Sequence, residues 1–129
     1  AKMSHNMADI KSFNDLLVWQ RAHRLFLEMV KLVEKLPKNR VATVISDQIL
    51  RSVSSISANI AEGYGRRGKD YERFLTIARG STTESEDWLM KMKDLGLMEE
   101  YIYKRIMGEC EEIIRMINGL LSSLRKQRE

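Results

Sequence analysis

Histidine, cysteine and paired carboxylates carry most chemistry in helical proteins, and this sequence uses them sparingly. A di-iron site in a helical bundle needs a glutamate three residues before each histidine. His5 and His23 instead follow Lys2 and Gln20 at that spacing. Zinc and iron sites need several ligands, so His23 alone is expected to be a surface or packed residue. The eight methionines and two tryptophans are interpreted as core filling. The sequence therefore predicts no metal site and no cofactor.

Nucleophilic catalysis is not predicted either. Cys110 falls on the apolar repeat of a helix, where burial would raise its pKa and leave it an inert small hydrophobe. No serine lies in a Gly-x-Ser-x-Gly elbow. Carboxylates alternate with basic residues, as at Glu100 and Lys104, which is typical of a solvated helix face. We expect no enzymatic activity.

Basic side chains remain as candidates for binding, with a net charge of +4. Two interpretations stay open. The basic residues can serve solubility, or they can contact the phosphate backbone of nucleic acid, which is sensitive to salt and indifferent to sequence. In a ring of several copies the patches would repeat and add. The candidate nucleic-acid-binding residues are Arg21, Arg24, Arg51, Arg66, Arg67 and Lys69.

Four amphipathic helices are predicted to position these residues. The chain of 129 residues has only one proline and seven glycines, and apolar residues recur every three or four positions. Short connections make consecutive helices antiparallel. The sequence thus predicts an all-α fold, an antiparallel up-down-up-down four-helix bundle, with helices from about Asp15 to Leu36, Ala42 to Ala61, Asp70 to Leu95 and Glu99 to Arg125.

The predicted helix ends rest on capping residues. Asn14 and Asp70 are expected to be N-caps of the first and third helices, and Gly63 the C-terminal cap of the second. Residues 1–13 are predicted to be a flexible leader, 14–125 a single domain and 126–129 a basic tail. The apolar seam of the last helix is expected to comprise Tyr103, Ile106, Cys110, Ile113, Ile117, Leu120 and Leu124.

Serines crowd the second predicted helix, at Ser52, Ser54, Ser55 and Ser57. They are either ordinary surface residues or the site where another helix or a second subunit approaches closely. We favour close approach, because serine is a mediocre helix former. Similarly, Gly80 and Ser81 would permit a tight crossing of the third helix.

One cysteine cannot form an internal disulfide, which favours a reducing, cytoplasmic setting. No stretch reaches the roughly 18 apolar residues of a membrane span. The N-terminus lacks the apolar core of a secretory signal.

Three segments of the sequence carry a family resemblance. They are Leu17-Val18-Trp19-Gln20, the run Asn59-Ile60-Ala61-Glu62-Gly63 with Gln48 to Ser52 before it, and Gly80-Ser81 followed by Glu84. Over roughly Phe13 to Leu124 the chain resembles the bacterial 23S rRNA intervening-sequence proteins, the S23 family. The motif residues are Asn59, Glu62, Gly63, Gly80, Ser81 and Glu84.

The resemblance implies a four-helix bundle that assembles as a homopentamer and has no enzymatic activity. It also implies a relation to the accessory variability factor of diversity-generating retroelements, a basic pentamer that binds nucleic acid. Asn59 and Glu62 are interpreted as capping residues or as partners of Arg66, with ligand contact as the alternative. The expected function is binding of RNA or an RNA–DNA hybrid by an oligomer. The alternative is a module that docks a protein partner.

Overall fold

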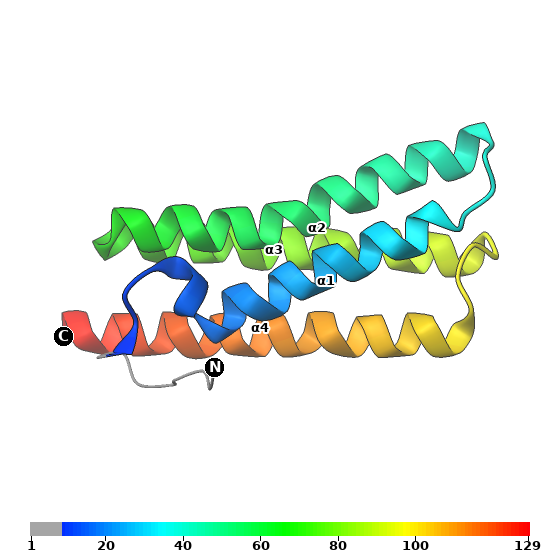
Figure 1. The fold of residues 1–129 in the computed structure, drawn as a ribbon. Coiled ribbons are helices and arrows are strands. Elements are labelled where there is room, and N and C mark those ends of the chain that lie inside the picture. The colour runs from blue at the N-terminus through cyan, green and yellow to red at the C-terminus, as the bar shows by residue number, and fades with distance from the viewer. Residues whose placement is uncertain (1–8) are drawn as a thin grey trace.

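The structure, a computed structural model, describes residues 9–129. Within them the chain forms one short 3₁₀ helix and four α-helices, with no β-strand (Figure 1). Successive α-helices run in opposite directions, which confirms the predicted all-α bundle. The elements are η2 (Phe13–Asp15), α1 (Leu17–Glu34), α2 (Arg40–Arg66), α3 (Gly68–Asp94) and α4 (Glu100–Arg128).

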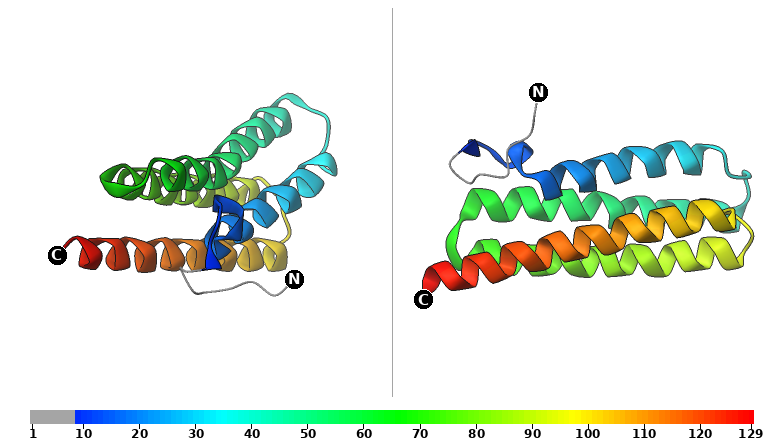
Figure 2. Two further views of the ribbon diagram at one scale, coloured as in Figure 1. Left: turned by 60° about the vertical axis from the view of Figure 1, so that its left-hand side comes forward. Right: turned by 90° about the horizontal axis from the view of Figure 1, so that it is seen from below.

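The four helices are unequal in length and in packing. Among the pairs of helices that pack side by side, α2 and α3 share the most extensive contact and α1 and α4 the least. Helix α1 is the shortest, with 18 residues, and begins part-way along α2, as both views in Figure 2 show. The short helix η2 packs against α1 and α2 at that point. The bundle is therefore tightest along the α2–α3 hairpin.

A continuous apolar core runs between the helices. It follows the spacing of three and four expected of buried helix faces. Twelve large side chains are less than 2% exposed: Leu25, Met29, Ile49, Ile56, Ile60, Leu75, Leu89, Met92, Ile106, Ile113, Ile117 and Leu121. No helix among residues 9–129 is long and apolar enough to cross a bilayer.

The seam of α4 differs from the predicted one near the end of the helix. Leu121 is 1% exposed and belongs to the core, whereas the predicted Leu120 and Leu124 are only partly buried. A step of four from Ile117 reaches Leu121 and a step of three reaches Leu120. Both steps suit a helix with 3.6 residues per turn.

Helix ends account for most other corrections. Asn14 is not the N-cap of α1, because it lies in η2 and its side-chain oxygen accepts a hydrogen bond from Ser12 Oγ. Helix α1 begins after Leu16. Asp70 is not an N-cap either, since α3 begins at Gly68. The prediction overlooked Asn39, whose Oδ1 accepts from the Ala42 amide at 2.9 Å and caps α2.

Gly63 does not end α2 and instead lies inside it. A Cβ atom at this position would approach the Phe74 Cβ to 2.7 Å and the Tyr71 side chain to 3.2 Å. The missing side chain lets α2 and α3 come together, so packing rather than turn geometry explains this glycine. The expected tight crossing at Gly80 is wrong, because a Cβ there would meet nothing within 4 Å among the described residues.

Serines of α2 face α3 within the same bundle. Ser52 is 2% exposed, and its Oγ lies 2.8 Å from Ser85 Oγ. Ser55 Oγ lies 3.0 Å from Ser81 Oγ and accepts from Asn59 Nδ2 at 2.9 Å. Close approach of another helix is therefore the correct interpretation for Ser52 and Ser55, and that helix is α3.

Candidate nucleic-acid interface

The six candidate binding residues lie in three places. Arg21 and Arg24 are on α1 where it faces α4. Arg66, Arg67 and Lys69 surround the α2–α3 connection, and Arg51 stands exposed in the middle of α2. The fold separates the α1 arginines from those of the α2–α3 connection, so they do not form one continuous patch.

The α2–α3 connection is far shorter than the basic loop that the sequence predicts. Helix α2 continues to Arg66 and α3 begins at Gly68, so Arg67 alone joins them. Arg67 has φ of 67° and ψ of 177°, a conformation that is normally restricted to glycine. Its guanidinium lies 4.2 Å from the centre of the Tyr64 ring. The turn thus holds an exposed arginine against an aromatic face in a strained backbone.

Basic residues at this connection differ in how far they are neutralised. Arg66 is paired with Glu62 at 2.8 Å and with Asp70 at 3.4 Å. In the described part of the chain, Arg67 and Lys69 have no carboxylate partner. The bridge from Glu62 to Arg66 is one of the two roles that the sequence predicted for Glu62.

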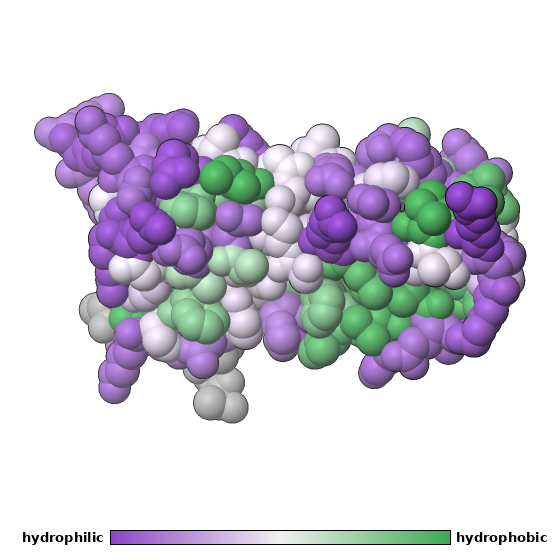
Figure 3. Space-filling model, turned by 90° about the horizontal axis from the view of Figure 1, so that it is seen from above, coloured by the Kyte–Doolittle hydropathy of each residue, from purple (hydrophilic) through white to green (hydrophobic). Residues whose placement is uncertain are grey.

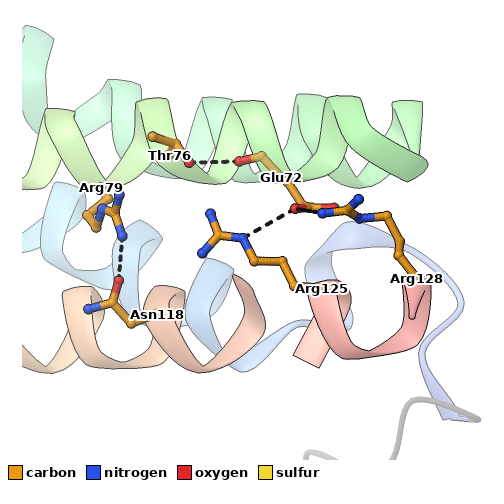
Figure 4. A network of polar contacts seen from close by, with 6 residues as sticks. All are labelled: Glu72, Thr76, Arg79, Asn118, Arg125 and Arg128. Atoms are coloured by element: carbon orange, nitrogen blue, oxygen red, sulfur yellow. Dashed lines mark hydrogen bonds and ion pairs between the residues drawn. The ribbon is translucent and has the colours of Figure 1, made fainter. Parts of the chain in front are cut away.

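The C-terminal turn of α4 joins the same end of the bundle (Figures 1 and 4). Glu72 of α3, whose side chain is 12% exposed, accepts from Arg128 Nε at 2.6 Å and lies 3.4 Å from Arg125 Nε. These hydrogen bonds and charges lower the pKa of Glu72. Nearby, Arg79 donates to Asn118 Oδ1 at 2.7 Å. Sequence reasoning missed Glu72, because its partners lie 53 to 56 residues away along the chain.

We call this region the basic end and define it by its cations. They come from the end of α2, the first turns of α3 and the last turn of α4. The basic end consists of Arg66, Arg67, Lys69, Arg73, Arg125, Lys126 and Arg128.

A second group of charges lies between α1 and α4. Arg21 donates to Glu109 through Nε and Nη2, both at 2.8 Å, and Arg105 lies 2.5 Å from Glu28. Each pair joins α1 to α4. These helices approach each other closely over only a short stretch, and the two ion pairs add to the apolar contact between them.

The pKa of Glu109 is lowered, first by the hydrogen bond from Arg21 and then by the charges of Arg21, Arg24 and Arg105. A lowered folded-state pKa adds stability above the ordinary value of 4.5, and that stability is lost as the pH falls through the folded-state value. Glu109→Gln should therefore lower the free energy of unfolding by up to about 1 kcal/mol at pH 7. The difference from the unsubstituted protein should shrink as the pH falls from 4.5 through the lowered pKa of Glu109, as measured by urea unfolding across pH. A difference that stays the same, or grows, as the pH is lowered through this range would contradict this account.

The remaining motif residues have structural neighbours. Asn59 Nδ2 donates to Ser55 O at 2.8 Å, so it does not cap the turn. Glu84 accepts from Trp88 Nε1 at 3.1 Å. Cys110 is fully buried, and burial together with nearby carboxylates raises its pKa to about 12. His5 lies outside the described residues, and within them no three potential ligands gather to hold a metal ion.

Comparison with known proteins decides the family. The model of the 23S rRNA-intervening sequence proteins matches residues 14–119, which is most of the chain. The chain belongs to this family. The match covers α1, α2 and α3, the α2–α3 turn, the α1–α4 ion pairs and α4 as far as residue 119.

A solved structure supports the same placement. This member of the intervening-sequence family is similar to a protein of unknown function from the S23 ribosomal protein family of Bacteroides thetaiotaomicron. The two are 27% identical, with a TM-score of 0.75, over 81% of this chain and 98% of the other. A search of curated proteins finds no match.

Proposed function

We propose that this protein is a non-catalytic, self-associating member of its family that binds nucleic acid, RNA or an RNA–DNA hybrid, through the basic end. The observation that carries the proposal is the conformation of Arg67. Backbone in this region costs about 1–3 kcal/mol and gathers at functional sites. Here it presents a guanidinium beside Lys69, with neither charge neutralised by a carboxylate of the described chain. Phosphate groups are suitable partners for such charges.

Self-association would strengthen binding, because every copy in the assembly contributes its own basic end and the modest positive charges add up. Exposed apolar side chains provide surface for it: Leu27, Val41 and Val44 are 47%, 55% and 50% exposed. Figure 3 shows hydrophobic side chains gathered over α1 and α2 near their connection. This region is at the other end of the bundle from the basic end, so association there leaves the basic end open. We propose a homopentamer in the cytoplasm, as the family resemblance implies.

Paired double variants test the proposal. Arg67→Gly with Lys69→Ala removes two cations from the basic end, and Lys38→Ala with Arg40→Ala removes the same two types from the opposite end. Binding to a mixed RNA pool and to an RNA–DNA hybrid is measured between about 50 and 200 mM salt. The first variant should bind at least about tenfold more weakly with a shallower salt dependence, and the control should bind normally. Light scattering should give a multiple of the protomer mass for all three proteins.

Stability separates a binding defect from a folding defect. Glycine adopts the backbone conformation of Arg67 without strain. Arg67→Gly should therefore raise the free energy of unfolding by about 1 kcal/mol rather than lower it. Equal binding by both double variants, or binding that ignores salt, would overturn the proposal.

The second candidate is a module that docks a protein partner. An aromatic cluster formed by η2 and the first turns of α1 favours it. Trp19 stacks on His23 with ring centres 4.7 Å apart, and the 38%-exposed Phe13 meets Trp19 edge-on at 5.1 Å. Aromatic side chains of this kind are common in protein interfaces. Protein purified at low salt without nucleic acid, as judged from absorbance at 260 and 280 nm, would favour this candidate.

A further inference from the structure

A hollow lies between α1 and α4, away from the basic end. Its volume is about 360 Å³, and it is lined by Arg21, Arg24, Leu25, Glu28, Arg105 and Glu109. Ligand pockets in proteins begin at about 300 Å³. All but one of the lining residues are charged, so the hollow is suited to an ionic ligand rather than an apolar one.

The charges of this hollow do not cancel. Three guanidiniums and two carboxylates line the hollow, which is an excess of one positive charge. The charge of Glu112 also acts on Arg21, but Glu112 is itself paired with Arg115. Glu109 holds Arg21 and Glu28 holds Arg105, whereas Arg24 is exposed and has no hydrogen-bond or ion-pair partner among the described residues. The hollow therefore has one guanidinium with free donors and two more held in place beside it.

The three guanidiniums lie on the same side of the bundle, because all three line the hollow. Their charges also act on Glu109 and, after the hydrogen bond from Arg21, lower the pKa of this carboxylate. Charges act on one another appreciably only within about a Debye length, roughly 8 Å at physiological salt. A second anion in the hollow would therefore lie in the field of the same three cations.

We propose that the α1–α4 hollow binds a phosphate group, with Arg24 as the main donor and with Arg21 and Arg105 flanking it. The planar guanidinium matches two phosphate oxygens at once, and Arg24 has both donors free. Glu109 and Glu28 hold the flanking Arg21 and Arg105 by ion pairs, and their negative charges disfavour a second phosphate. The volume leaves room for a sugar attached to that phosphate.

The inference goes beyond the proposed function, because a phosphate would bind here whether or not the basic end binds nucleic acid. The phosphate has two possible sources. It can belong to a free nucleotide or inorganic phosphate, or it can be the terminal phosphate of a nucleic-acid strand. Both present the same oxygens to Arg24, and the experiment must separate them.

Thermal unfolding with added inorganic phosphate or adenosine monophosphate at constant ionic strength tests the site. Arg24→Gln removes this guanidinium and should fold normally, since Arg24 is exposed and pairs with no residue of the described part of the chain. Arg40→Gln is the matched control, because Arg40 is also exposed, has no ion pair in the described chain and is not one of the candidate binding residues. The unsubstituted protein and the control should gain about 4 °C at a tenfold excess of ligand over its Kd, and Arg24→Gln should gain nothing.

RNA with and without a 5′-phosphate separates the two sources. A preference for the phosphorylated strand that disappears in Arg24→Gln assigns the site to a strand end. Equal binding of both strands, with the thermal shift intact, assigns it to a free nucleotide or phosphate. An equal thermal shift in Arg24→Gln, or no shift in the unsubstituted protein, would overturn the site itself. Loss of RNA binding with the shift retained would overturn only the proposed function.

Discussion

Gly63→Leu is expected to lower the free energy of unfolding by about 3 kcal/mol, the upper end of what overpacking usually costs. A Cβ at Gly63 would already lie 2.7 Å from the Phe74 Cβ, an atom next to the backbone that cannot move without its helix. A leucine would push α2 and α3 apart where they pack most closely. The melting temperature should fall by roughly 10 °C.

Gly80→Leu is the control for this experiment. Gly80 also lies inside a long helix, but a side chain there meets nothing within 4 Å in the described chain. Leucine is the better helix former by roughly 0.8 kcal/mol, so this variant should be as stable as the original or more so. If both leucine variants melted alike, Gly63 would not be the point of close approach.

Leu121→Ala is expected to lower the free energy of unfolding by about 3 kcal/mol, measured by urea or thermal unfolding. Leu121 is 1% exposed within the core, so alanine would leave a cavity as well as lose the buried methyl groups. Leu120 is only partly buried at the edge of the core. Leu120→Ala should therefore lower the stability by less than about 1.5 kcal/mol.

The pair of substitutions decides between the two seams of α4. The periodic pattern of the sequence assigns Leu120 to the core, and the structure assigns Leu121. A larger loss for Leu120→Ala than for Leu121→Ala would show that the last turns of α4 are rotated toward the predicted seam.

Periodicity was sufficient to predict the four helices and most of the core. It depends only on the repeat of apolar residues, which the packing of amphipathic helices requires. The helix ends were harder. Gly63 and Gly65 read locally as a helix stop, yet tertiary contact with α3 extends α2 to Arg66. A single sequence contains no signal of that contact.

In the candidate site, too, only contacts between residues close together in the sequence could be predicted. The Glu62–Arg66 pair could be anticipated, because residues four apart share a helix face. The Arg21–Glu109 and Arg128–Glu72 pairs could not, because they depend on how separate helices are rotated against one another. For the same reason, nothing in the sequence indicated that Arg24 would have no ion pair among residues 9–129 while Arg21 and Arg105 are neutralised.

The unequal contacts among the helices have a consequence for how the bundle opens. Helix α1 meets α4 over a narrow contact that includes two ion pairs, whereas α2 and α3 form a closely packed hairpin. We expect local opening to begin by parting α1 from α4, with the hairpin intact. The arginine-lined hollow lies on that seam. An anion bound there would contact both helices and oppose their separation. Binding of the anion and opening of α1 are therefore linked equilibria, and a ligand that fills the hollow should also make α1 more rigid.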